Sequence, residues 1–187
     1  GIENVYIKDM HKKHNNINLD YPLIYRDKKK YILSLYPKWH SRLLPDSILR
    51  TESRNAILQD VSHTNSIHKV YLTRMQGTDQ LSNGDVLIIY RTNDGVGPAH
   101  YRSVATSLCV VEAVRNIYSF KTLDDFLDYT ESYSIFSKSE LQQMFRKKNY
   151  TTIIKFNYNY ALPRRITRGE MIQEIGISSN YWGFFEL

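Results

Sequence analysis

The sequence feature that most limits the fold is a succession of β-prone runs, separated by turn-forming residues, that begins at Ile67. Residues 68–73 alternate as a half-buried strand does, and an Asn-Gly-Asp turn at residues 83–85 precedes the apolar run 86–91. A longer β-prone run covers residues 101–114. Strands joined by such turns predict that this part of the chain folds around a β-sheet.

Short helices are predicted after these strands. Thr122 begins the first, and a capping box at residues 137–140 begins the second. Residues 151–160 alternate as another strand, which Pro163 is expected to end. A further capping box at residues 167–170 leads into one more helix. Together with the strands, these elements predict the α+β class.

The first part of the chain carries two further β-prone runs, at residues 23–25 and 31–36. They flank the charged link 26–30, whose lysines are interpreted as a solvated turn. Two such runs around a short link are typical of a β-hairpin. We therefore expect a β-hairpin extension within residues 1–45.

Composition divides the chain into three parts. The hairpin extension, residues 1–45, is followed by a mostly polar linker, residues 46–66, and by the main domain, residues 67–187. The chain begins at Gly1 instead of Met, which is interpreted as the start of an excised piece. Residues 1–45 could then be the end of a preceding domain.

Charge and cysteine content narrow the partners and the environment. Among 187 residues, 25 Lys plus Arg stand against 19 Asp plus Glu, and this net charge of +6 favours a polyanionic partner. The single cysteine, Cys109, excludes an internal disulfide framework, so a reducing, cytoplasmic setting is predicted. No apolar stretch approaches the ~18 residues that a membrane span needs, so no membrane partner is expected.

No catalytic, metal or cofactor motif is recognisable in the sequence. The Gly-x-x-x-x-Gly-Lys-Ser/Thr and Gly-x-Gly-x-x-Gly patterns are absent, which leaves ATP and dinucleotides unsupported. His11 with His14 and His63 with His68 have metal-ligand spacing but lack supporting cysteines or carboxylates, so no metal is expected. Cys109 is interpreted as a small buried hydrophobe rather than a nucleophile. We expect no cofactor and no catalytic centre in these residues alone.

Three segments resemble the EVE type of PUA-like domain. Residues 83–91, Asn-Gly-Asp-Val-Leu-Ile-Ile-Tyr-Arg, are similar to a strand of that family with Gly-Asp, an apolar pair, an aromatic residue and a polar tip. Residues 103–114 are similar to the second strand of the EVE family, which follows the first after a loop. Residues 158–167, which include Leu-Pro-Arg-Arg-Ile-Thr, resemble the strand that turns into a helix. Order and spacing agree over residues 67–176.

The resemblance implies a small, partly open β-barrel with flanking short helices that binds RNA, or DNA with a modified base. The ligand-binding residues it implies lie at the end of one strand and the start of the next: Tyr90, Arg91, Thr92, Tyr101, Arg102 and Ser103. A base outside its stack gains ~1–3 kcal/mol from an aromatic face and needs polar groups at its edge. The tyrosines, the hydroxyls and the arginines could meet these needs. The alternative is that the tyrosines pack the barrel and the arginines are rim charges.

The chain departs from the EVE pattern in two places. Arg91 stands where a histidine is often seen, and the loop 93–100 is long, so the ligand stays open. The pattern of the related ASCH group, Gly-x-Lys-x-x-Glu-x-Arg, is absent, and the chemistry of that group is therefore not carried over.

A fainter resemblance concerns residues 36–47, Tyr-Pro-Lys-Trp-His-Ser-Arg-Leu-Leu-Pro-Asp-Ser. They look like a linker in bacterial proteins that join a GNAT-type acetyltransferase to a PUA-like tail. The acetyl-CoA loop of such enzymes, Gln/Arg-x-x-Gly-x-Gly/Ala, is missing from this chain. Three functions stay open: a nucleic-acid or modified-nucleotide reader, a substrate-selecting accessory part of an acetyltransferase, and a protein-interaction module.

Overall fold

The computed structural model describes residues 16–44, residue 47 and residues 66–187. The expectations for residues 1–15, for most of the linker 46–66 and for the histidines at 11, 14 and 63 lie outside these described residues.

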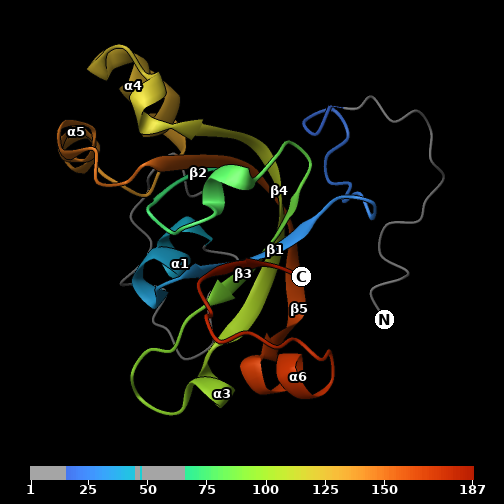
Figure 1. The fold of residues 1–187 in the computed structure, drawn as a ribbon. Helices are drawn as coiled ribbons and strands as arrows, with labels where there is room; N and C mark the ends of the chain where they lie inside the picture. Colours follow the sequence, from blue (N-terminus) through green and yellow to red (C-terminus); the bar gives the residue numbers. More distant parts are fainter. Residues whose placement is uncertain (1–15, 45–46, 48–65) are drawn as a thin grey trace.

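Strands of the described residues form one mixed, six-stranded sheet that does not close (Figure 1). Its spatial order is β2-β5-β4-β3-β1-β6. The strands are β1 (Lys30–Leu35), β2 (His68–Thr73), β3 (Val86–Arg91), β4 (Val104–Asn116), β5 (Thr152–Thr167) and β6 (Phe184–Glu186). The long strands β4 and β5 pair with several register shifts, which bend the sheet. The predicted α+β class and the partly open, barrel-like sheet are confirmed.

Short helices flank the sheet (Figure 1). The α-helices are α1 (Pro37–Leu43), α3 (Ala99–Arg102), α4 (Leu123–Thr130), α5 (Lys138–Lys147) and α6 (Arg168–Gln173). Single 3-10 turns are η3 (Thr78–Gln80), η4 (Ile117–Ser119) and η5 (Glu131–Tyr133). Figure 1 shows α4 and α5 at one end of the sheet and α3 and α6 at the other.

Capping boxes set the start of three of these helices. Thr122, Ser137 and Thr167 each accept a hydrogen bond from a backbone N–H three residues later, and the acidic side chain there accepts one in return from the backbone N–H of the capping residue. Such boxes satisfy two otherwise unpaired donors of the first turn. The predicted boxes at residues 137–140 and 167–170 are confirmed, as is the helix that begins after Thr122.

The predicted hairpin between residues 23–25 and 31–36 is wrong. Residues 23–25 have no regular structure, and β1 instead lies between β3, to which it is parallel, and β6, to which it is antiparallel. Leu33, for example, is paired with both Ile89 and Phe184. The apolar β1 is buried on both faces, and it gains more from two distant partners than from one exposed neighbour. The boundary of the domain at residues 46–66 stays a prediction.

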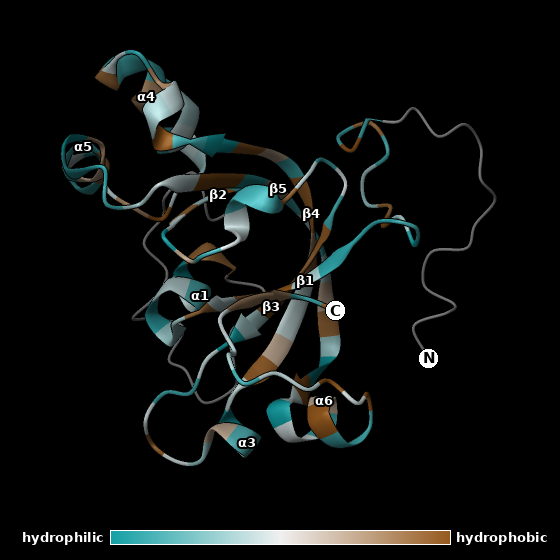
Figure 2. Ribbon diagram, viewed as in Figure 1, coloured by the Kyte–Doolittle hydropathy of each residue, from teal (hydrophilic) through white to brown (hydrophobic). Residues whose placement is uncertain are grey.

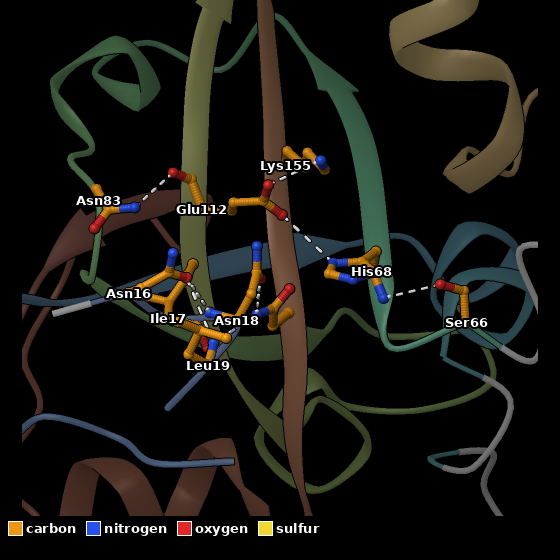
Figure 3. A network of polar contacts seen from close by, with 10 residues as sticks. Asn16, Ile17, Asn18, Leu19, Ser66, His68, Asn83, Glu112 and Lys155 are labelled. Atoms are coloured by element: carbon orange, nitrogen blue, oxygen red, sulfur yellow. Dashed lines mark hydrogen bonds and ion pairs between the residues drawn. The ribbon is translucent and has the colours of Figure 1, made fainter. Parts of the chain in front are cut away.

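Residues 16–25 lie along β5 without forming a strand. The Asn157 amide donates to Asn18 Oδ1 over 2.9 Å, and the Tyr21 hydroxyl donates to the Tyr158 carbonyl over 3.2 Å. Asn159 likewise donates to the Leu23 carbonyl over 3.3 Å. Side-chain hydrogen bonds therefore hold this segment on the sheet, and Figure 3 shows its first residues beside β5.

Two other boundaries differ from expectation. The run expected to begin at Tyr101 begins as β4 at Val104, because residues 99–102 form α3 after Pro98. Pro163 does not end β5, which continues to Thr167. The register between β4 and β5 jumps from the pair Ser107–Ala161 to the pair Ala105–Ile166. Pro163 lies in this bulge, where its missing N–H costs no ladder hydrogen bond.

Apolar side chains form a core on each face of the sheet. The larger cluster includes Leu33, Leu87 and Phe156 and is covered by α1, α4 and α5. The smaller cluster consists of Ile32, Tyr90, Ala105, Leu162 and Met171, the last from α6. Figure 2 shows hydrophobic residues along the strands and hydrophilic ones over much of α5. Among the described helices, none combines the length and apolarity that crossing a membrane requires.

Candidate nucleic-acid interface

The expected ligand-binding residues gather where β3 ends and β4 begins, beside α3 and α6 (Figure 1). Arg91 is paired with Val104 and Tyr90 with Ala105, so the two predicted segments do lie side by side. A glycine allows α3 and α6 to approach closely, because a Cβ on Gly169 would overlap the His100 imidazole. This approach fixes the position of α3 relative to the strands.

Tyr90 and Ser103 come together, but in a covered position. Tyr90 is only 1% exposed, and its ring centroid lies 5.2 Å from that of Trp182. Burial raises the pKa of Tyr90, and hydrogen bonds of its hydroxyl with Ser103 and Arg168 oppose this effect. The indole of Trp182, tilted by 39° to the Tyr90 ring, therefore packs against it.

Trp182 completes this group, which we call the Tyr90 cluster: Tyr90, Ser103, Arg168 and Trp182. The Arg168 guanidinium lies over the Trp182 ring, 4.6 Å from its centroid. The Ser34 hydroxyl donates to the Trp182 carbonyl over 2.6 Å and holds the backbone of this residue on β1. The Arg168 backbone N–H also donates to the Ser103 carbonyl over 2.9 Å, which joins α6 to the start of β4.

Arg91 points away from the Tyr90 cluster, because successive side chains of a strand face opposite sides. It is 2% exposed and, with Arg165, lies near His40 of α1. Burial, and secondarily the charges of Arg91 and Arg165, lowers the pKa of His40 to about 3. In this arrangement Arg91 is an interior residue and does not reach a ligand at the surface.

Hydroxyl groups line the interior around His40. Its Nε2 lies 2.8 Å from Thr106 Oγ1, and Ser107 Oγ donates to the same oxygen over 3.2 Å. Ser47 Oγ lies 2.7 Å from Ser107 Oγ and 2.8 Å from the Tyr158 hydroxyl. The β4 bulge at residues 105–107 provides this polar layer, which we call the His40 layer. A neutral imidazole suits the interior, because a charged one would lose its hydration.

Tyr101 and Arg102 are presented outward by α3. Tyr101 is 69% exposed and contacts His100 edge-on, with the two ring centroids 4.7 Å apart. Arg102 Nε donates to Asp94 Oδ1 over 2.7 Å, and the hydrogen bonds of Arg102 hold the pKa of Asp94 well below its usual range. Tyr101 is thus free to stack, whereas Arg102 is engaged by the long loop. Thr92 is partly buried, and its N–H donates to the Leu35 carbonyl over 2.9 Å.

Further cations lie on the same end of the sheet. Arg164 is paired with Glu170 and lowers the pKa of that carboxyl to about 2. Arg165 donates to the Thr106 carbonyl over 3.3 Å and to the Leu162 carbonyl, and burial lowers its pKa. Neither Arg165 nor Arg168 forms an ion pair with a carboxylate of the described residues. The charge of Arg168 is therefore not neutralised by a carboxylate of that part of the chain, whereas Arg165 is engaged by the two backbone carbonyls.

Sequence reasoning missed Arg168, Trp182 and His40. Arg168 follows a helix cap and Trp182 follows a loop, and they meet Tyr90 only because β5 and β6 bring distant segments together. Neither spacing nor composition signals that meeting. Near the C-terminal end of the sequence, Phe184 packs into the core: it is 5% exposed and stacks on Tyr31, with the two ring centroids 5.1 Å apart.

A second polar cluster lies on β2, β4 and β5 (Figure 3). Glu112 Oε1 lies 2.8 Å from Lys155 Nζ, and Glu112 Oε2 lies 3.4 Å from His68 Nδ1. Asn83 Nδ2 donates to the Glu112 carbonyl over 2.8 Å, so the turn before β3 contacts the same residue. Each charge in this cluster has a counter-charge, which makes it a weaker candidate for an anionic ligand.

A hollow of about 520 Å³ opens beside α4, away from the α3 and α6 end. It is lined by Arg115, Ser119, Phe120, Lys121, Asp125, Asp128 and Tyr129. Arg115 stacks over Phe120, 3.7 Å from the ring centroid, and Asp125 is used in the α4 capping box. Cations and carboxylates share this hollow, so it favours no single charge in a ligand.

Metal and thiol chemistry find no support in the described residues. No group of three or more His, Cys, Asp or Glu side chains in that part of the chain could hold a metal ion. Cys109 is fully buried, as predicted, and burial raises the pKa of its thiol. A buried, protonated thiol is a poor nucleophile.

Comparison with known proteins finds no matching family model and no matching curated sequence. Among solved structures, ASCH from Zymomonas mobilis aligns with a TM-score of 0.52 and 12% identity over 86% of this chain and 89% of that chain. A single-substitution mutant of that ASCH protein aligns with a TM-score of 0.51 and 9% identity, over 86% of this chain and 91% of that chain. At such identities the likeness shows the fold alone. The EVE and acetyltransferase resemblances stay predictions, and the chain has the PUA-like fold that ASCH domains also have.

Proposed function

We propose that this chain binds nucleic acid through the end of the sheet that carries α3 and α6. We call the contact region the α3–α6 surface and define it by Tyr101 of α3 and Arg168 of α6. The observation that carries the proposal is an aromatic ring, Tyr101, 69% exposed on α3, beside a helix whose Arg168 has no carboxylate partner in the described chain.

Each part of this surface suits a feature of a single strand. An exposed tyrosine can stack on a base whatever its sequence, which is worth ~1–3 kcal/mol per base. Guanidinium groups bind phosphate oxygens through paired N–H donors. The net charge of +6 adds a favourable long-range field. The PUA-like fold is compatible with this use, although fold alone does not assign a function.

The test is the anisotropy of labelled single-stranded RNA, single-stranded DNA and duplexes of the same sequence, titrated with the protein at two salt concentrations. Tyr101→Ala should weaken single-strand binding roughly tenfold through loss of one stack. Tyr118→Ala is the matched control, because Tyr118 is 67% exposed but lies on η4, outside the proposed surface.

Arg168→Gln should lower the slope of log affinity against log salt by about 0.7 on a single strand, the value for one phosphate contact. Equal effects of Tyr101→Ala and Tyr118→Ala would place the interface elsewhere. Absence of binding to every oligonucleotide would reject the proposal and favour a protein-interaction module.

Reading of a modified base is the more specific form of this proposal. It would use the Tyr90 cluster, whose aromatic, hydroxyl and guanidinium groups could hold a base and its edge. Oligonucleotides that differ only by one methylated base test it. A reader should distinguish them at high salt, where phosphate contacts are weak, whereas a general binder should not.

A further inference from the structure

We propose that Trp182 occupies the position of a nucleic-acid base, so that an unpaired base binds at Tyr90 by displacing the chain's own indole. This inference rests on the proposed function and adds its ligand: one unstacked base of a single strand. It also adds a form of regulation, because the Trp182 indole in its observed position on Tyr90 competes with that base.

The contacts of the indole are those that a bound base would use. Its ring centroid lies 5.2 Å from that of Tyr90, and the Arg168 guanidinium lies 4.6 Å from the indole centroid. Ser103 and Arg168 hydrogen-bond with the Tyr90 hydroxyl and so lie beside the ring. Aromatic stacking, a guanidinium and a nearby hydroxyl together hold a flat heteroaromatic ring of either origin.

The indole is held less firmly than the residues beneath it. Tyr90 is 1% exposed, whereas Trp182 is half-buried and follows residues 177–181, which form no helix or strand. The indole N–H makes no hydrogen bond with any residue that the structure describes, although the backbone carbonyl of Trp182 accepts one from Ser34. The side chain is therefore held by packing: it contacts Tyr90 and Arg168 and meets the Phe185 ring edge-on, with the two ring centroids 5.7 Å apart. Another flat ring can take over the contacts with Tyr90 and Arg168.

Competition between the indole and a base predicts the direction in which the affinity for a single strand changes. When a site is open for only a fraction of the time, the apparent dissociation constant rises by the inverse of that fraction. Removing the indole should therefore tighten the binding of a single strand, by roughly tenfold for a site that is open about one-tenth of the time. If Trp182 were instead a direct stacking partner or a packing residue, its removal would weaken binding or leave it unchanged.

The first experiment compares Trp182→Ala with the unaltered chain in anisotropy titrations of a labelled single-stranded RNA. Tyr181→Ala is the matched control, because Tyr181 is the neighbouring residue and is 59% exposed. Tighter binding for Trp182→Ala alone supports the inference, and equal or weaker binding overturns it. Should Trp182→Ala fail to fold, Trp182→Leu replaces it, since leucine keeps an apolar side chain at this position and removes the flat ring that lies on Tyr90. Trp182→Leu should tighten binding several-fold, and unchanged binding would overturn the inference.

The second experiment follows the indole itself in a Trp39→Phe background, because the chain has two tryptophans. Addition of single-stranded RNA should shift the Trp182 emission to the red and increase its quenching by acrylamide, as the ring moves into water. A blue shift or reduced quenching would mean that the ring is covered by RNA, which contradicts displacement. If no nucleic acid binds any of these variants, the proposed function itself fails; if RNA binds and Trp182 stays in place, only the inference fails.

Discussion

His40 should make the stability of the protein fall in mild acid. Its imidazole is fully buried, its ordinary pKa is 6.5, and burial together with Arg91 and Arg165 lowers the native pKa to about 3. The unfolded chain therefore takes up a proton below pH 6.5 while the folded chain does not, so stability is complete above that pH and is lost progressively below it. Each pH unit is worth ~1.4 kcal/mol. At a pH of about 5, roughly 1.5 units below the ordinary value, the loss is about 2 kcal/mol.

The assay is urea unfolding followed by circular dichroism between about pH 8 and about pH 5, for the unaltered chain and for His40→Gln. Glutamine can still contact Thr106, 2.8 Å from the imidazole in the native chain, but it does not titrate. The difference in free energy of unfolding between the unaltered chain and His40→Gln should shrink by about 2 kcal/mol as the pH falls from about 8 to about 5. His68→Gln, which removes a partly exposed imidazole, controls for the loss of any histidine. An advantage that stays constant with pH would refute the buried, neutral state of His40.

Other features give further tests. Cys109 is fully buried, so a thiol reagent such as Ellman's should react with the native chain no faster than the chain unfolds; rapid labelling would contradict its burial. Thr167→Ala removes the cap of α6 and should cost about 1 kcal/mol in urea unfolding, whereas an unchanged midpoint would mean that the capping box contributes nothing. Gly169→Ala should cost roughly 1–3 kcal/mol by pushing its new methyl group against His100, and the double variant with His100→Ala should recover most of that loss. A loss that persists in the double variant would point to backbone strain instead.

Local patterns in the sequence were sufficient for the elements whose causes are local. The capping boxes at Ser137 and Thr167 fix helix starts through hydrogen bonds within four residues, and both formed as predicted. β3 was visible because a turn with a positive-φ glycine, Gly84, precedes an unbroken apolar run. These features depend on neighbours in the chain, which a single sequence displays.

The errors concern pairings between distant residues. β1 was assigned to a hairpin with its nearest β-prone neighbour, whereas its partners β3 and β6 are far away in sequence. Pro163 was expected to end β5, but it lies among residues 162–165 of β5, which the register shift between β4 and β5 leaves without partners on β4. Hydrophobic runs indicate that strands exist and not which strands meet.

In the candidate site, too, the local pairing of segments was predictable and the contacts between distant residues were not. The expected segments around Tyr90 and Ser103 are adjacent, because the β3–β4 pairing follows from the order of strands. The orientation of single side chains was not predictable: Arg91 faces the interior and Tyr101 faces water. Trp182 reaches Tyr90 through the placement of β6 beside β1, a contact between residues far apart in the sequence.

The position of β1 between β3 and the edge strand β6 has a kinetic consequence. Leu33 of β1 pairs with Phe184 of β6, about 150 residues later in the chain, and with Ile89 of β3 on its other side. Contacts between residues so far apart slow folding, because the intervening chain must be ordered before they form. During synthesis β1 would emerge early and wait, with apolar side chains and an unpaired edge, until residues 184–186 have left the ribosome. This interval is when the nascent chain is most exposed to aggregation.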